Sequence, residues 1–147
     1  PSMSDALRVT VLVSGSGTNL QAIIDARQSG LLDADIIHVV SNVADARGLQ
    51  RAAEAGITTS VLEHGRFADR ADFDSALALL MAAGDPQLVV LAGFMRILSP
   101  WFVQHYAGRI LNIHPALLPA YPGLDTHQRV LDAGERWHGS ATPRFQS

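Results

Sequence analysis

The chain has 147 residues, with 48% apolar and 17% charged side chains and a formal net charge of −3, which is typical of one globular domain with a sizeable core. It contains no cysteine, which excludes a disulfide framework, cysteine-type zinc sites and thiol nucleophiles. There is no basic stripe, no signal-peptide pattern and no apolar run near the roughly 20 residues that span a bilayer, so we expect a cytoplasmic protein that binds neither nucleic acid nor membranes.

Strand-like aliphatic runs alternate with helical patterns along the chain. Repeated strand–helix units with nearly continuous aliphatic strands predict an α/β fold, a doubly wound, mainly parallel sheet covered by helices on both faces. The loops after the first, fourth and fifth strands should meet where the strand order reverses beside the first strand. The strands are expected at residues 8–13, 35–40, 57–62, 88–91 and 109–113, and the helices at 20–30, 44–55, 70–83 (with Phe73, Leu77 and Leu80 on one face), 100–106 and 126–134.

The first loop, GSGTN at residues 15–19, joins a predicted strand to a predicted helix. Glycines let the backbone approach a ligand, and the free N–H groups at a helix N-terminus suit a phosphate. The loop lacks the lysine of a triphosphate-binding loop and the glycine spacing of a dinucleotide fingerprint. It therefore predicts a site for a phosphate monoester, with Thr18 and Asn19 as side-chain donors. The alternative is a plain glycine-rich turn with a Ser/Thr cap.

The fifth predicted strand ends in Asn112-Ile113-His114-Pro115. Residues two apart in a strand point to the same side, so the amide of Asn112 and the imidazole of His114 should face one spot. Pro115 favours extended backbone at His114 and ends the strand. This pair at the carboxyl edge of a sheet predicts catalysis. A structural histidine beside a turn-forming asparagine is the alternative.

Residues 92–100 follow the fourth predicted strand and carry apolar side chains. They either wall a site for a flat heteroaromatic ligand or form core beneath a loop. Residues 115–125 form a turn-rich connection of a kind that is usually functional or mobile. No metal is expected, because His127 and His138 share no metal-ligand spacing with His114, and because His38, His64 and His105 are expected to be structural or solvated.

Three segments together resemble the phosphoribosylglycinamide formyltransferase family of purine synthesis. They are VLVSGSGTNLQAIIDA at residues 11–26, LAGFMRILSP at 91–100 and LNIHPALLPAYPG at 111–123, in the family's order. The resemblance runs from residue 8 to about residue 142. It implies a Rossmann-like formyltransferase fold and the transfer of a formyl group from 10-formyltetrahydrofolate to the amine of glycinamide ribonucleotide.

The resemblance also implies roles for single residues. An amide and a protonated imidazole at the catalytic positions would stabilise the oxyanion that develops as the amine attacks the formyl carbon. The matching positions are Asn112 and His114 for catalysis, Gly17, Thr18 and Asn19 for the substrate's phosphate, Gly93, Met95 and Pro115 for the substrate channel, and Arg70, Phe94, Arg96, Ile97 and Leu98 for the folate.

The sequence departs from the family's pattern after Thr142. Pro143 stands where the family has histidine, residues 143–147 form a divergent tail, and the family's catalytic aspartate, last strands and C-terminal helix are absent. We therefore expect weakened catalysis, and low stability or self-association, such as a homodimer, through an exposed sheet edge. Residues 1–147 are taken as a single domain, in which residues 1–7 are an N-terminal extension or tag remnant.

Three other functions fit parts of the sequence. A formyltransferase or hydrolase could use 10-formyltetrahydrofolate with another acceptor or with water, although the first loop favours a phosphorylated acceptor. A non-catalytic module that binds a phosphate ligand would fit the missing aspartate. A nicotinamide-binding domain fits least well, because Asn42 stands where an acidic residue would hold the ribose.

Overall fold

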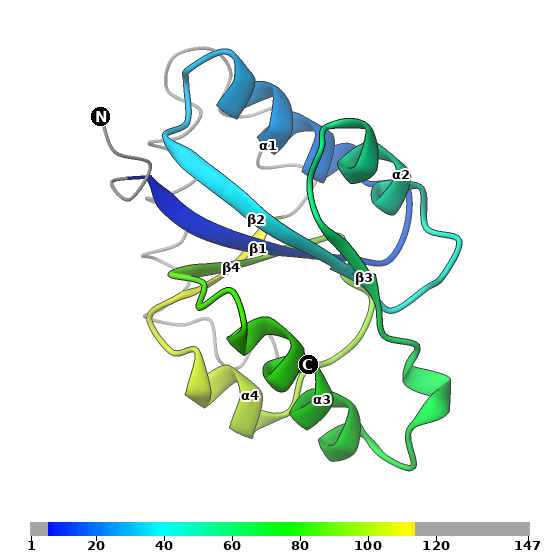
Figure 1. The fold of residues 1–147 in the computed structure, drawn as a ribbon. Helices are drawn as coiled ribbons and strands as arrows, with labels where there is room; N and C mark the ends of the chain where they lie inside the picture. The colour runs from blue at the N-terminus through cyan, green and yellow to red at the C-terminus, as the bar shows by residue number, and fades with distance from the viewer. Residues whose placement is uncertain (1–5, 114–147) are drawn as a thin grey trace.

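The computed structural model describes residues 6–113 as a layered α/β fold (Figure 1). The helix expected at 126–134 lies outside these residues, and every element expected before it is present. The strands are β1 (Leu7–Val13), β2 (Ala34–Ser41), β3 (Thr59–Val61), β4 (Leu88–Ala92) and β5 (Ile110–Ile113). The helices are α1 (Thr18–Gln28), α2 (Arg47–Glu54), the 3₁₀ turn η2 (His64–Arg66), α3 (Arg70–Ala82) and α4 (Pro100–His105).

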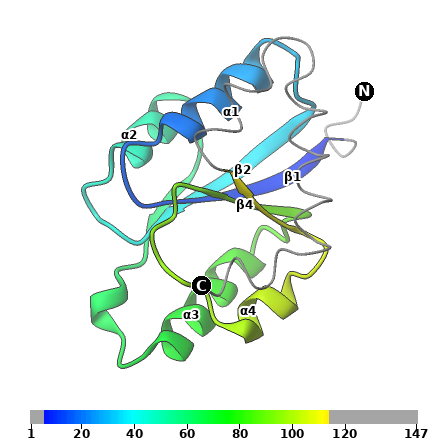
Figure 2. The same cartoon turned by 180° about the vertical axis from the view of Figure 1, so that it is seen from behind.

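The strands form one parallel sheet of five in the order β3-β2-β1-β4-β5. The chain winds outward from β1 to β3 and then returns to the other side of β1 as β4, so the strand order reverses between β1 and β4. Helices α1 and α2 cover one face of the sheet, and α3 and α4 cover the other (Figures 1 and 2). The predicted doubly wound sheet is confirmed, and the carboxyl edge beside β1 and β4 is where such folds bind ligands.

The core lies on both faces of the sheet. Residues 9–13 of β1 are all buried, as expected for a central parallel strand covered on both sides. On α3 the buried apolar residues are Phe73, Leu77 and Met81. Leu80 was expected on that face but is only partly buried, because the spacing of four residues from Phe73 to Leu77 continues to Met81.

Two boundaries differ from the expected ones. Leu7, which was assigned to the N-terminal extension, begins β1, because it pairs with Ala34 of β2 in the parallel ladder. Helix α2 begins at Arg47 instead of residue 44. The first amides of a helix have no acceptor in a preceding turn, and Gly48 N, at the second position, donates instead to the carbonyl oxygen of Gly15 at 3.0 Å. The first loop therefore helps to set where α2 begins.

No helix within residues 6–113 is long and apolar enough to cross a bilayer. The edge strand β3 is shorter than expected, at Thr59–Val61, and its residues are exposed or half-buried. Its pairing is confined to the last residues of β2, from Val39 to Ser41.

His38 on β2 is half-buried, and its Nε2 lies 2.7 Å from the hydroxyl of Ser60 on β3. Desolvation lowers the pKa of His38 from its ordinary value of 6.5, because burial disfavours the charged ring. The unfolded chain therefore binds a proton here more readily than the folded chain. It follows that stability is fully present above the unfolded pKa and is lost as the pH falls through it.

We expect His38→Gln to reduce this pH dependence, because glutamine keeps a polar side chain and does not titrate. The melting temperature of the unchanged chain should drop more than that of the variant between about pH 7.5 and about pH 5.5. Scanning calorimetry measures both drops, with the same substitution at exposed His105 as the control. Equal drops in the unchanged chain and in His38→Gln would contradict this account.

Candidate functional site

The loop after β1 presents backbone N–H groups at the start of α1. Gly17 is the N-cap residue of α1 with φ 76°, a conformation that favours glycine, and no side chain caps this helix end. The first amides of a helix have no intrahelical acceptor and carry the positive end of the helix dipole. Thr18 is exposed beside them. We call residues 15–18 the N–H cradle, and its geometry suits the predicted phosphate.

Helix α2 packs against the N–H cradle and holds it in place. A Cβ at Gly17 would lie 2.5 Å from the Cα of Gly48, so the two backbones are in direct contact. Gly48 N donates to the Gly15 carbonyl oxygen at 3.0 Å, and Arg51 Nε donates to the Ser16 carbonyl oxygen at 2.7 Å. These contacts are made within the protein, so the conformation of the loop does not depend on a ligand.

Asn19 connects the start of α1 to the end of β5. Its side chain is 8% exposed, and its Nδ2 donates to the carbonyl oxygen of Ile113 at 3.5 Å. Asn112, the residue before that carbonyl, is half-buried. The first and fifth strand ends therefore meet as expected. Of the two predicted side-chain donors, Asn19 is used by this contact and Thr18 is exposed. His114, Pro115 and the segment 115–125 lie outside the described residues.

The hydroxyl of Ser14 joins the connections that follow three strands. It accepts from the backbone N–H of Met95, after β4, at 2.7 Å. It donates to Oδ1 of Asn42, after β2, at 2.5 Å. The Asn42 amide in turn lies 3.3 Å from Nδ1 of His64. Ser14 itself follows β1, so one buried side chain fixes the relative positions of the loops at this edge of the sheet.

Residues 93–99, which we call the β4–α4 loop, contain most of the positions expected to contact folate. Ser14 holds the loop near its beginning, and Asp74 holds its end, because Asp74 Oδ2 accepts from Ser99 N at 2.6 Å. Between these points, the guanidinium of Arg96 lies 4.5 Å from the centroid of the Phe73 ring. The loop backbone is thus anchored to the protein at both ends and in the middle.

Some side chains of the β4–α4 loop are exposed and could wall a ligand, and others belong to the core. Met95 and Ile97 are 82% and 38% exposed, so they are available to wall a ligand. Leu98 is 1% exposed and belongs to the core, so only its backbone could contact a folate. Phe94 is half-buried and packs against the core. Arg70, also expected to contact folate, is exposed at the first position of α3.

Sequence reasoning missed three buried polar residues that hold these loops: Ser14, Asn42 and Asp74. Ser14 and Asn42 each follow directly on the last residue of an aliphatic strand, which is the position from which a side chain can reach a neighbouring loop. Asp74 falls three residues before Leu77 on the apolar face of α3. A carboxylate at such a position needs a hydrogen-bond partner, and this was the signal that could have revealed it.

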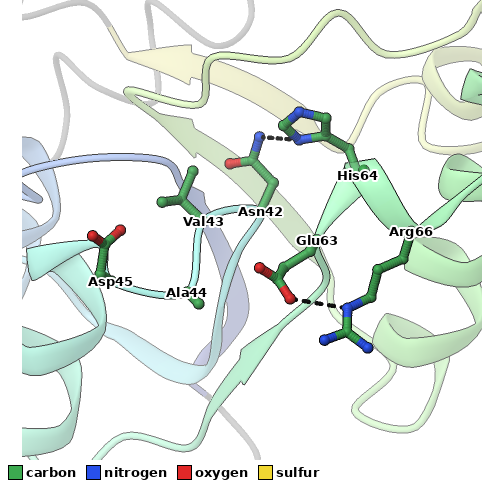
Figure 3. A pocket seen from close by; sticks show the side chains of 8 residues that line it. Asn42, Val43, Ala44, Asp45, Glu63, His64 and Arg66 are labelled. Carbon is green, nitrogen blue, oxygen red and sulfur yellow. Dashed lines mark hydrogen bonds and ion pairs between the residues drawn. The ribbon is translucent and has the colours of Figure 1, made fainter.

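An open cleft of about 740 Å³ lies beside this site, between the β2–α2 connection and the segment after β3 (Figure 3). Asn42 and His64 face each other across it, and Glu63 pairs with Arg66 at 3.0 Å. The paired charges neutralise each other, and no predicted site residue of the described part of the chain lines the cleft. Within residues 6–113 no group of three acidic or histidine side chains could hold a metal ion.

The family model described as formyl transferase matches residues 7–143 of the chain. The chain belongs to the formyl transferase family. Phosphoribosylglycinamide formyltransferase of Escherichia coli is 52% identical over 92% of this chain and 64% of its own length. The Haemophilus influenzae enzyme of the same name is 49% identical over 90% of this chain and 63% of its own length. The chain thus spans a little under two thirds of these relatives.

Solved structures show the same relationship. The phosphoribosylglycinamide formyltransferase of Coxiella burnetii aligns with a TM-score of 0.73 and 55% identity, over 88% of this chain and 61% of that one. The Brucella melitensis enzyme aligns with a TM-score of 0.73 and 45% identity, over 88% of this chain and 68% of that one. Within the formyl transferase family, the chain is therefore a homologue of the phosphoribosylglycinamide formyltransferases.

We expect Gly17→Ala to destabilise this formyl transferase chain. A left-handed alanine costs about 1–2 kcal/mol, and its Cβ would lie 2.5 Å from the Cα of Gly48, which adds to that cost. Urea denaturation should therefore give an unfolding free energy lower by about 2 kcal/mol or more. Gly15→Ala is the matched control, because a Cβ there has nothing within 4 Å. Similar losses in the two variants would contradict the close packing of the cradle on α2.

Proposed function

We propose that this protein transfers a formyl group from 10-formyltetrahydrofolate to the amine of glycinamide ribonucleotide, in purine synthesis. The observation that carries the proposal is the hydrogen bond from Asn19 Nδ2 to the Ile113 carbonyl oxygen. It brings the end of β5, with Asn112, beside the N–H cradle. A substrate whose phosphate occupies the cradle would then extend its amine toward Asn112. The named activity of relatives at 52% and 49% identity supports the same reaction.

The ribonucleotide end of the proposed site is the N–H cradle. An uncapped helix N-terminus offers both hydrogen-bond donors and a favourable dipole to a phosphate. Gly15 is exposed and has nothing within 4 Å of the position its Cβ would take, so the phosphate can approach the backbone there closely, and exposed Thr18 adds a hydroxyl donor. This end would distinguish a phosphorylated acceptor from water.

The folate end of the proposed site is the β4–α4 loop. Backbone groups of residues 96–98 would read the polar edge of the pteridine ring, while exposed Met95 and Ile97 would cover its apolar faces. Arg70 is exposed at the start of α3 and would meet the acidic tail of the folate. The cradle follows β1 and the β4–α4 loop follows β4, the two neighbouring strands between which the strand order reverses.

The protein's contribution to the chemistry is to stabilise charge and to move a proton. 10-formyltetrahydrofolate supplies the formyl group. As the amine attacks the formyl carbon, negative charge develops on the formyl oxygen, and the Asn112 amide and a protonated His114 would donate to it. A positioned donor of this kind contributes about 3 kcal/mol. The bond between the formyl carbon and the folate nitrogen then breaks. The protonated His114 would give its proton to that leaving nitrogen, and the neutral imidazole would then take the proton that the former amine loses.

Two rival functions make different predictions. An enzyme that uses another acceptor, or water, would release or transfer the formyl group without glycinamide ribonucleotide. A non-catalytic module would bind glycinamide ribonucleotide without turnover, even in the presence of 10-formyltetrahydrofolate. Calorimetric titration with each ligand, followed by a formyl-transfer assay on the same sample, separates the three.

In that titration we expect the chain to bind glycinamide ribonucleotide, and Thr18→Val to bind it roughly tenfold more weakly. The reason is that a hydrogen bond to a charged group contributes about 1.5 kcal/mol or more. The affinity of the same variant for a folate ligand should not change. Thr59→Val, the same substitution at an exposed position on β3, is the control. If Thr18→Val and Thr59→Val bind glycinamide ribonucleotide equally well, the phosphate does not lie at the cradle.

For the chemical step, we expect Asn112→Ala to lower kcat about 100- to 1000-fold relative to the unchanged chain, with little effect on KM, because the lost donor acts on the transition state. The measurement is the steady-state rate of formyl transfer with both substrates varied. Gln104→Ala, on the exposed side of α4, should keep the rate of the unchanged chain. A full rate in Asn112→Ala would remove this residue from the catalytic set.

A further inference from the structure

Asp74 is a buried carboxylate that the proposed reaction does not use. It lies in the second turn of α3 and is 0% exposed. Its Oδ2 accepts from the backbone N–H of Ser99 at 2.6 Å, across 25 positions of the sequence. Burying a carboxylate is costly unless it is hydrogen-bonded. Its placement against one particular backbone amide therefore needs an explanation beyond packing.

Ser99 is the junction between the β4–α4 loop and α4. Its N–H binds Asp74, and its Oγ accepts from Phe102 N at 3.3 Å as the N-cap of α4. The next residue, Pro100, has no N–H to offer. The Ser99 amide is thus the last backbone donor of the loop, and its only described acceptor is on α3. When α3 is fixed, the end of the loop is fixed with it.

Helix α3 is packed into the core. Phe73, Leu77 and Met81 on the same helix are buried in the core. The Phe73 ring also supports the Arg96 guanidinium, at 4.5 Å from the ring centroid. Among the described residues, Oδ1 of Asp74 and Nε of Arg96 are both buried without a hydrogen-bond partner. One turn of α3 therefore supports the loop at two points, Arg96 and Ser99. The Oδ1 atom of Asp74 and the Nε atom of Arg96 are kept away from water.

We propose that Asp74 is a positioning residue for folate recognition: through Ser99 it holds the backbone of residues 96–98 in the conformation that reads the pteridine edge. The inference rests on the proposed function, in which the backbone of residues 96–98 in the β4–α4 loop recognises the pteridine edge. Asp74 does not touch the ligand in this account. It acts on affinity for the folate and leaves the N–H cradle, which is held by Gly48 and Arg51 of α2, unaffected.

The test compares Asp74→Leu, which removes the acceptor at similar size, with Asp74→Asn, which keeps an acceptor oxygen. Asp74→Ala is measured beside them as a second variant without the acceptor, in case the leucine is not accommodated. Asp72→Leu is the control, because Asp72 is exposed on the same helix. Two properties are measured on the full chain: amide hydrogen exchange at Ser99 by NMR, and the Kd values for 5-formyltetrahydrofolate and for glycinamide ribonucleotide.

We expect at least tenfold faster exchange at Ser99 and at least tenfold weaker folate binding in Asp74→Leu and Asp74→Ala. Binding of glycinamide ribonucleotide should stay within about twofold, and Asp74→Asn should recover most of the folate affinity. Equal losses of affinity for both ligands would mean that Asp74 has only a structural role, and would overturn the proposal. An unchanged exchange rate at Ser99 would overturn it as well. If the unchanged chain fails to bind 5-formyltetrahydrofolate, the proposed function is wrong at its folate end, and the exchange at Ser99 still decides whether Asp74 holds the loop.

Discussion

The hydroxyl of Ser14 is the contact on which the arrangement of the site depends. A parallel sheet ends in loops that have no hydrogen-bond ladder of their own, so something else must fix their relative positions. Here one buried hydroxyl accepts from the loop after β4 and donates to the side chain that follows β2. Both of its hydrogen-bonding roles are used within the protein. The strand ends that surround the proposed site are thereby joined before any ligand arrives, which is the preorganisation that binding and catalysis need.

The site has two halves with different supports. On one side, α2 presses on the N–H cradle through the contact between Gly17 and Gly48, and Asn19 links the cradle to β5. On the other side, α3 supports the β4–α4 loop through Asp74 and Phe73. Helix α2 on one face of the sheet thus holds the cradle, and α3 on the other face holds the β4–α4 loop (Figure 2). Under the proposed function, this division would let a phosphorylated acceptor and a folate donor be recognised by separately supported loops that meet beside β1 and β4.

The fold was predictable because its main signals are local. Aliphatic runs identified the strands other than β3, whose segment at residues 57–62 is half Thr and Ser, and the glycine-rich loop marked the start of α1. Boundaries were less predictable where tertiary contacts decide them, as at α2, whose early amide bonds to Gly15. At the proposed site, Gly17, Thr18 and Asn112 could be suggested from the sequence because their motifs are contiguous. Ser14, Asn42 and Asp74 were missed because each acts through a hydrogen bond to a residue at least 25 positions away, and such a pairing leaves no local pattern.

The central claim is that the N–H cradle and the amide of Asn112 belong to one binding site. NMR titration of the labelled chain with glycinamide ribonucleotide tests it most directly. The account predicts that the backbone amides of Gly17 and Thr18 and the side-chain amide of Asn112 shift together, with one shared Kd. Shifts at the cradle that leave Asn112 unchanged, or shifts confined to the cleft beside His64, would contradict it.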